Sequence, residues 1–293
     1  GLFSVDRVMV GEESFGTWTQ TQDTDAPDGE GFSNSLKMQC TTAIASPIAG
    51  GVLNLQQVIE GANLQQLSFG SAYAKSVTLS FWIKSNKIGT YVLNIRQTSG
   101  TTRRVVIPYT IDTANTWEKK TITVEGDTSG LFNNDNNRAL QITWWLGAGP
   151  DYTSGTAPTG WGVATQEDYA PSQVNLADAV DNYINITGVQ LEVGEEATPF
   201  EHVPYDISLQ RCQRYFEIIQ ANDTDTALCV GQAVSTTTCR GIISYTRKRA
   251  YPTVEMIGAL PSGFTVCRAD GIRNWSTGVR TVHFPSLTTQ EVD

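Results

Sequence analysis

The feature that most constrains this fold is a series of short segments in which apolar and polar residues alternate. The clearest of them is VTLSFWIK, residues 77–84. Its apolar side chains on one face are Val77, Leu79, Phe81 and Ile83. The same alternation recurs over residues 90–97, 103–111, 117–125 and 139–146. Because successive side chains of a strand point to opposite faces, each segment predicts a half-buried β-strand.

Clusters of turn residues separate these segments. Residues 126–137 (GDTSGLFNNDNN) and 147–162 (GAGPDYTSGTAPTGWG) are rich in Gly, Asn, Asp, Ser, Thr and Pro, which favour turns and loops. Strands at near-regular spacing with such turns indicate an all-β sandwich or barrel, and no β–α–β rhythm is present. Pro108 removes a hydrogen-bond donor from its segment, which predicts an edge strand or a bulge.

Weaker signals come from the segments that precede residue 77. Residues 35–40 predict a short strand, and residues 52–69 predict a strand followed by a short helical turn. Residues 16–35 are rich in Asp, Gly and Thr and predict a loop or an irregular segment.

Among the tryptophans, we assign Trp144 and Trp117 to the core.

The strand around residues 184–193 changes its phase of alternation at Gly188. Its apolar residues are Ile184 and Ile186 in one phase and Val189, Leu191 and Val193 in the other. One extra residue reverses the facing of everything after it, and glycine best tolerates such an insertion. We therefore predict a β-bulge at or near Gly188 that directs the second apolar set into the core.

The chain that leaves this strand carries two adjacent acids. Gly194, Glu195 and Glu196 predict an exposed turn where the strand leaves the sheet. Pro199 and Phe200 are then expected to fasten the exiting chain to the edge of the domain.

The character of the chain changes near residue 205. Residues 1–205 contain 11 Lys/Arg against 22 Asp/Glu, whereas residues 206–293 contain 9 against 8. Residues 206–219 place apolar side chains at helical spacing, although one helical turn leading into a strand fits equally well. The remainder predicts about five short strands. We predict a β-sandwich over residues 1–205 and a small β-rich module over residues 206–293, which is expected to oligomerise because so small a module buries little surface alone.

Composition argues against several classes of partner. Nucleic-acid affinity rests mainly on clustered cations, so the acidic balance of residues 1–205 argues against it. No apolar run approaches the ~20 residues of a membrane span, so no membrane insertion is expected. The five cysteines have no paired metal-binding spacing and are expected to be free thiols, with a Cys229–Cys239 bridge as an alternative. The chain begins with Gly1, which suggests a piece of a longer polypeptide.

Several motifs, taken in order, resemble one group of proteins. They are VTLSFWIKS and GTYVL (from residue 77), TWEKKTITVEGDTSG (from 116), ITGVQLEVGEEATPFE (from 186) and LQRCQRYFE (from 209), with weaker pieces VDR (5–7), QQVIEG (56–61) and RAYPTVE (249–255). This order resembles bacteriophage tail-fibre, receptor-binding and capsid-fibre proteins that carry a jelly-roll domain like a carbohydrate-binding module. The chain departs from that pattern at Val8, where the group has a tryptophan.

The resemblance implies an all-β jelly-roll sandwich in a virion structural protein, usually a homotrimer without enzymatic activity. Such a protein would be made in the host cytoplasm and would lie on the particle surface, in tail or capsid, against other virion proteins. Two roles are compatible with it. One is a fibre or receptor-binding component attached to host-surface glycans, and the other is a capsid decoration or head-fibre protein with a purely structural role.

Aromatic side chains support the glycan-binding interpretation. Sugar rings present apolar C–H faces that stack on Trp and Tyr, while amides and carboxylates bond the hydroxyls. The candidate residues are Trp145 and Trp82 on the polar faces of their strands, and Tyr152, Trp161 and Tyr169 in the loop after residue 146. The alternative is that these aromatics fill the sandwich or a trimer interface.

Nothing in the sequence predicts catalysis. His202 and His283 have no neighbouring nucleophile motif, and adjacent acids such as Glu195 and Glu196 need not flank a glycosidic bond. We expect no cofactor. A structural calcium ion is a weaker alternative, because Asp127 and residues 135–137 supply loop oxygens without EF-hand spacing.

Overall fold

The computed structural model describes most of the chain. The described residues are 8–100, 102–219, 231–233, 239–241, 244–250, 265–268 and 271–274. The chain divides into two compact units between Gln213 and Arg214.

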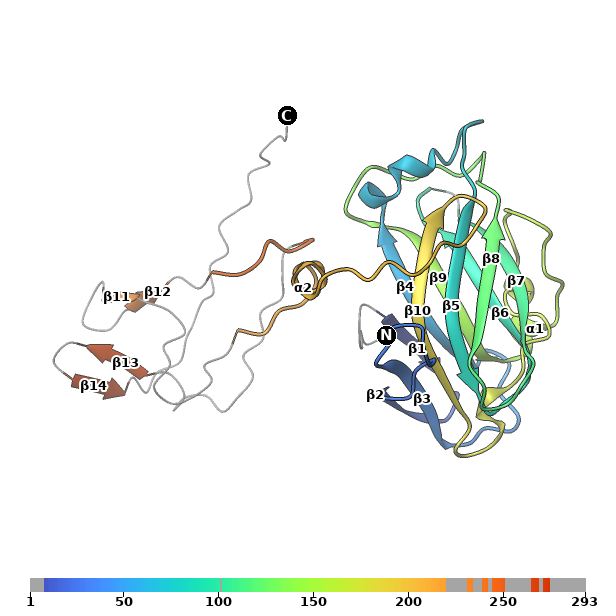
Figure 1. The fold of residues 1–293 in the computed structure, drawn as a ribbon, viewed down its shortest axis with the longest axis horizontal. Coiled ribbons are helices and arrows are strands. Elements are labelled where there is room, and N and C mark those ends of the chain that lie inside the picture. Colours follow the sequence, from blue (N-terminus) through green and yellow to red (C-terminus); the bar gives the residue numbers. More distant parts are fainter. Residues whose placement is uncertain are drawn as a thin grey trace. The chain divides into compact units, whose positions relative to one another are not determined.

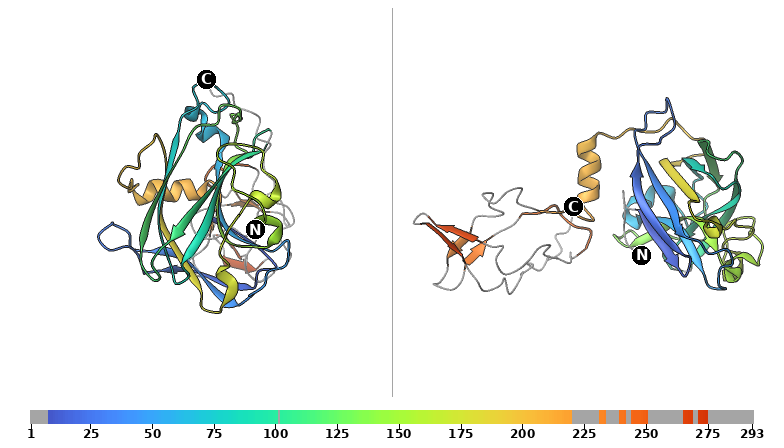
Figure 2. Two further views of the ribbon diagram at one scale, coloured as in Figure 1. Left: turned by 90° about the vertical axis from the view of Figure 1, so that its right-hand side faces the viewer. Right: turned by 90° about the horizontal axis from the view of Figure 1, so that it is seen from below.

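The first unit contains a sandwich of two five-stranded antiparallel sheets, stacked face to face (Figure 1, Figure 2). Sheet A has the order β1 (Val8–Glu13), β4 (Val52–Glu60), β9 (Arg138–Ala148), β6 (Gly89–Gln97) and β7 (Arg103–Ile111). Sheet B has the order β2 (Thr17–Asp23), β3 (Ser35–Thr42), β10 (Tyr183–Val193), β5 (Val77–Ser85) and β8 (Glu118–Val124). The chain crosses repeatedly between the sheets, so the predicted all-β jelly-roll sandwich is confirmed.

Short helical turns connect some of these strands. They are η2 (Gly61–Asn63), η3 (Gln65–Leu67), α1 (Pro150–Thr153), η4 (Gln166–Asp168) and η5 (Leu176–Asp178). The strand and helical turn predicted over residues 52–69 are therefore confirmed. Pro108 lies in β7, which is an edge strand of sheet A as predicted.

The core lies between the sheets and is built from the alternating apolar residues. Phe81 of β5 contacts Trp144 of β9 edge-on, with ring centroids 5.8 Å apart, and contacts Tyr109 of β7 at 5.6 Å. Each such buried aromatic contributes about 1.5–3 kcal/mol through the hydrophobic effect. The assignment of Trp144 to the core is confirmed.

The assignment of Trp117 to the core is wrong. This residue precedes β8 and is half-buried, and its indole Nε1 donates to Asp25 Oδ1 at 2.9 Å. Trp117 therefore packs at the sandwich surface, where its polar N–H finds a partner.

The prediction of a loop over residues 16–35 is also wrong in part, because Thr17–Asp23 form strand β2 at the edge of sheet B. Of its side chains, Trp18 packs against the core, while the Thr residues of the strand are exposed. An edge strand with so few apolar contacts leaves almost no periodic signal in the sequence.

The predicted bulge in β10 is confirmed. The pairing of β10 with β5 shifts register between Thr187 and Gln190, and Gly188 has a φ of +60°. The shift brings Val189 and Leu191 against the core, on the same side as Ile184 and Ile186. Placing Val193 in the core was wrong, because it ends the strand and is 47% exposed.

After the exposed turn at Gly194–Glu196, residues 197–202 form a strap over sheet B. The Glu201 N–H donates to Gln190 Oε1 at 2.7 Å, and the Phe200 ring contacts Phe32 edge-on at 4.9 Å. The exiting chain is thus fastened to the sandwich as expected. The contacts are with the outer face of β10, where this strand pairs with β5 alone, and with Phe32 in the connection between β2 and β3.

The strap leads to helix α2 (Tyr205–Gln213). Sequence spacing allowed either a helix or a turn into a strand here, and the structure has a helix that ends before Phe216. No helix in the described part of the chain is long and apolar enough to span a membrane.

The second unit contains two short antiparallel hairpins among its described residues. They pair β11 (Gly231–Ala233) with β12 (Cys239–Gly241), and β13 (Thr265–Arg268) with β14 (Gly271–Asn274). Cys40 and Cys212 are free thiols. The Cys229–Cys239 alternative, much of the segment for which about five short strands are predicted, and His283 lie outside what the structure describes.

Replacing Gly188 with alanine tests the bulge. A Cβ atom there would lie 2.6 Å from Phe32 Cζ, in addition to the strain of a positive φ. We expect Gly188→Ala to lower the free energy of unfolding by about 2–4 kcal/mol, measured by urea denaturation.

Gly29→Ala is the matched control, because Gly29 has a φ of +76° with nothing within 4 Å of its Cβ position. It should cost only about 1 kcal/mol, from backbone strain alone. Equal costs for the two variants would contradict a packing role for the bulge.

Candidate functional site

The structure brings three of the five candidate aromatics together. Trp145 lies on the outer face of sheet A, and Tyr152 and Tyr169 lie in the loop of residues 149–173 that follows β9. The Trp145 and Tyr152 ring centroids are 5.3 Å apart, and those of Tyr152 and Tyr169 are 6.2 Å apart. We call these three residues the aromatic stack.

The Arg104 guanidinium packs against the Tyr169 end of the stack. Arg104 Cζ lies 3.3 Å from the centroid of the Tyr169 ring, a close cation–π contact. Burial raises the pKa of Tyr152, and the nearby charge of Glu13 raises it further. Tyr152 and Tyr169 are half-buried, so each keeps part of its ring at the surface.

Trp145 itself is only 5% exposed. It packs with Val92, Val106 and Ala170 in a second apolar cluster on the outer face of sheet A. Trp145 is therefore the base of the stack and not an open platform, and only the rings of Tyr152 and Tyr169 keep part of their surface exposed.

Trp161 is separate from the stack. Its ring contacts Phe69 edge-on at 5.5 Å, and its Nε1 donates to the Glu125 carbonyl at 2.7 Å. It is half-buried and packs against the main core, which fits the alternative that it fills the sandwich.

Trp82 lies on the other sheet. It is half-buried on the outer face of β5, next to Gly188 and the Phe32 side chain. Alternation placed it correctly on an outward face, but that face belongs to sheet B, so Trp82 does not join the stack.

The loop that carries the tyrosines is fixed to sheet A. The Asn94 Nδ2 donates to the Tyr169 carbonyl at 2.6 Å, and the Val92 N–H donates to Gln173 Oε1 at 2.8 Å. Arg104 and Gly162 exchange two backbone hydrogen bonds. In Figure 1 this loop, with α1, runs beside β6 and β7. The tyrosines are thus held in place before any ligand binds.

Sequence reasoning missed a set of polar residues beside the stack. They share the outer face of sheet A, and we call them the polar face: Asn54, Gln56, Asn94, Arg96, Arg104, Gln141 and Thr143. Strand pairing places Gln56, Thr143 and Asn94 in one row, and Gln141, Arg96 and Arg104 in the next. Only cross-strand register brings these residues together, which no single segment of sequence reveals.

Hydrogen bonds fix the amides of the polar face. Gln141 Nε2 donates to Gln56 Oε1 at 3.0 Å and to Thr143 Oγ1 at 3.1 Å, and Gln56 Nε2 donates to Asn54 Oδ1 at 2.7 Å. The donors of these amides are therefore used within the protein, while the buried acceptor Gln141 Oε1 has no partner.

Several buried polar atoms on this face have no partner. Among the described residues, eight buried side-chain nitrogen or oxygen atoms lack a hydrogen bond, and four of them lie on this face. These four are Asn94 Oδ1, Arg96 Nε, Gln141 Oε1 and Trp145 Nε1. An unpaired buried polar group costs about 1–3 kcal/mol, so such clustering calls for an explanation.

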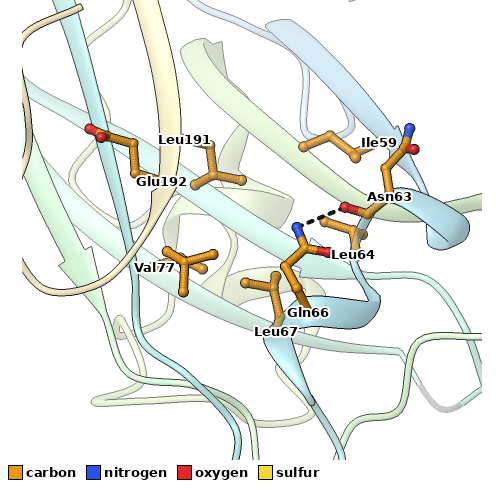
Figure 3. A pocket seen from close by; sticks show the side chains of 9 residues that line it. Ile59, Asn63, Leu64, Gln66, Leu67, Val77, Leu191 and Glu192 are labelled. Carbon is orange, nitrogen blue, oxygen red and sulfur yellow. Dashed lines mark hydrogen bonds between the residues drawn. The ribbon is translucent and has the colours of Figure 1, made fainter. Parts of the chain in front are cut away.

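A small cavity lies elsewhere in the sandwich, between η2–η3 and the ends of β5 and β10 (Figure 3). Its volume is about 120 Å³, and Leu64, Leu67, Val77 and Leu191 make its lining largely apolar. Ligand sites usually have volumes of roughly 300–1,000 Å³ and convergent polar groups. The cavity is therefore a weaker candidate than the polar face.

The carboxylates considered for calcium are hydrogen-bonded to other groups of the chain. Asp127 accepts from Arg103 Nε at 2.6 Å and from the Ser129 N–H at 3.0 Å, so both of its oxygens have partners. Asp135 is bonded by Asn137 through both oxygens. In the part of the chain that the structure describes, no three of His, Cys, Asp and Glu are grouped to hold a metal.

The fold and this face define a jelly-roll β-sandwich with an ordered aromatic and polar surface on one sheet. No protein-family model and no curated protein sequence matches the chain. Among solved structures, it is similar to the enzymatically active domain of tailspike protein 4 of bacteriophage CBA120, with 16% identity and a TM-score of 0.38 over 65% of this chain. The match spans 20% of that tailspike chain.

The chain is also similar to carbohydrate-binding modules. A family 11 module from Clostridium thermocellum has 11% identity and a TM-score of 0.36, over 66% of this chain and 93% of the module. A family 16 module has 10% identity and a TM-score of 0.31, over 66% of this chain and 99% of the module. At TM-scores below 0.5, these likenesses do not transfer a function to this chain.

The Arg103–Asp127 pair generates a test of the structural role of Asp127. Asp127 is 2% exposed, so Asp127→Asn would leave Arg103 without its counter-charge. We expect a loss of about 3 kcal/mol in the free energy of unfolding, and no increase in Tm when calcium is added to the unsubstituted protein.

Asp23→Asn is the matched control, because Asp23 pairs with Lys37 at 3.2 Å in a more exposed setting. Its cost should be about 1 kcal/mol or less. A rise in Tm with calcium that Asp127→Asn abolishes would show that Asp127 is a ligand after all.

Proposed function

We propose that this protein is a non-enzymatic bacteriophage virion component that binds host-surface glycans through the outer face of sheet A. The polar face would bond sugar hydroxyls, and the exposed parts of Tyr152 and Tyr169 would stack on sugar rings. The order of sequence motifs, which resembles phage fibre and receptor-binding proteins, supports the virion setting.

The observation that carries the proposal is the clustering of four unpaired buried polar atoms on this one face. Asn94 Oδ1 and Gln141 Oε1 are acceptors, and Arg96 Nε and Trp145 Nε1 are donors. A sugar hydroxyl both donates and accepts, so a glycan can satisfy groups of both kinds. Each bond formed would remove a cost that the free protein carries.

The approach of a ligand requires a local change. Gln56 and Arg96 are long, half-buried side chains in the same two rows as the buried amides. They would swing aside or bond the sugar themselves, while the backbone stays in place. Side-chain rearrangement of this size is common in binding proteins whose backbones are preformed.

We further propose that three copies assemble. Helix α2 exposes Tyr205, Ile207 and Leu209, with Tyr205 80% exposed. Such side chains suit contact with another copy or with another virion protein. Three linked sites gain avidity without any new contact to each glycan, so weak single sites suffice for attachment.

Gln141→Leu tests the glycan site. The change roughly keeps the side-chain volume. It removes the unpaired acceptor Gln141 Oε1 and also the Nε2 donor that bonds Gln56 and Thr143. We expect binding to a printed array of bacterial surface polysaccharides to weaken at least tenfold, a change of about 1.4 kcal/mol in binding free energy. Circular dichroism should confirm that the variant remains folded.

Gln39→Leu is the matched control. Gln39 lies on β3 of sheet B, and its Nε2 donates to Asp181 Oδ1 at 2.9 Å, so the same group is lost away from the polar face. It should bind as the unsubstituted protein does. Failure of the unsubstituted protein to bind any polysaccharide would favour the capsid-decoration role, and release of reducing ends would contradict a non-enzymatic protein.

A further inference from the structure

Two arginines face each other on the outer face of sheet A. Arg96 of β6 and Arg104 of β7 are direct cross-strand partners. Their neighbours Ile95 and Val105 belong to the inner core, so both arginine side chains point to the outer face. Like charges directly opposite each other on a sheet are destabilising, and their presence needs a reason.

Neither arginine has a counter-charge among the described residues. No carboxylate lies within 4.0 Å of either guanidinium, and neither side chain makes a hydrogen bond there. Arg104 is only 6% exposed, and its one charge-related contact is the Tyr169 ring. Burial, together with the charge of Arg96, lowers the pKa of Arg104 to about 10, with Tyr169 acting in the opposite direction.

The absence of a counter-charge does not reflect a shortage of acidic residues. Residues 1–205 contain 22 acidic residues against 11 basic ones, so a carboxylate is the most available partner in this part of the chain. The adjacent Arg103 has one, in the buried Asp127. Within the described part of the chain, Arg96 and Arg104 therefore lack a counter-charge although acidic residues are plentiful and the neighbouring Arg103 is paired.

We propose that the Arg96–Arg104 pair binds an oxyanion carried by the glycan, either the carboxylate of an acidic sugar or a phosphate substituent. This inference rests on the proposed function and names the class of glycan that the site takes. Guanidinium groups bond carboxylate and phosphate oxygens in a bidentate geometry. Two of them would replace the water molecules around the anion and compensate its negative charge.

The surrounding residues suit a charged sugar. Gln141 is the cross-strand partner of Arg96 in the same row, and its open Oε1 can accept from a hydroxyl next to the anion. Asn94 Oδ1, in the neighbouring row, offers a second acceptor. Tyr169 stacks on Arg104 and holds the guanidinium plane in place, so the cation is oriented before the ligand arrives.

The test uses a panel of purified bacterial surface polysaccharides. Each acidic polysaccharide is printed beside its carboxyl-reduced form, and each phosphorylated one beside its dephosphorylated form. We expect binding to weaken at least tenfold when the oxyanion is removed. Weaker binding to a carboxyl-reduced form would identify a carboxylate as the recognised group, and weaker binding to a dephosphorylated form would identify a phosphate. Binding to the acidic form should also weaken as salt is raised.

Arg96→Gln keeps hydrogen-bond donors but removes one charge, and its half-buried position makes it the safer variant for folding. It should lower the preference for an acidic form over its neutral form at least tenfold, so the measured quantity is the ratio of the two affinities. Arg104→Met should lose acid binding while Tm stays equal or rises, because an unpaired buried charge is removed. Arg211→Gln, in exposed helix α2, is the charge-matched control. It should change neither the binding of acidic forms nor the Tm.

The outcomes separate the two proposals. Equal binding to acidic and neutral forms, or an Arg96→Gln variant that retains full preference for the acid, would overturn the oxyanion site and leave glycan binding standing. No binding to any polysaccharide would overturn both.

Discussion

The structure depends on the burial of β9 on both of its faces. Trp144 and Trp145 are adjacent in sequence and therefore point to opposite sides of sheet A. Trp144 lies in the core between the sheets, against Phe81, and Trp145 lies in the outer cluster beneath Tyr152. The inner tryptophan joins the two sheets, and the outer one anchors the loop that shapes the site. Fold and candidate site are thus organised by two neighbouring side chains of one strand.

Much of this fold follows from the sequence, because alternation reflects a physical requirement. A strand with one face in the core repeats its apolar residues every two positions, and β5, β6, β7 and β9 do so. The bulge at Gly188 was visible for the same reason, as a break in that period. Strand β2 was not visible, because an edge strand with little apolar surface can satisfy its backbone through β3 without a periodic pattern.

The candidate site could be predicted only in part. Alternation puts Trp145 and Trp82 on outward faces, but the sheet to which each strand belongs depends on the order of strands, which the pattern does not encode. The depth at which Trp145 is buried depends on how the 149–173 loop folds back. The polar face joins residues from β4, β6, β7 and β9, so its members become neighbours only when the register of three strand pairs is known.

The strap over sheet B has a mechanical consequence. The chain that leaves the sandwich is bonded to Gln190 and Glu192, in the part of β10 that pairs with β5. Tension applied beyond His202 would first have to detach these bonds and the Phe32–Phe200 contact. Any force that remained would then act on β10, which pairs with β5 as far as Val193 and with β3 only over Tyr183–Ile186. A pull therefore meets the hydrogen bonds between β10 and β5 before it reaches those between β10 and β3.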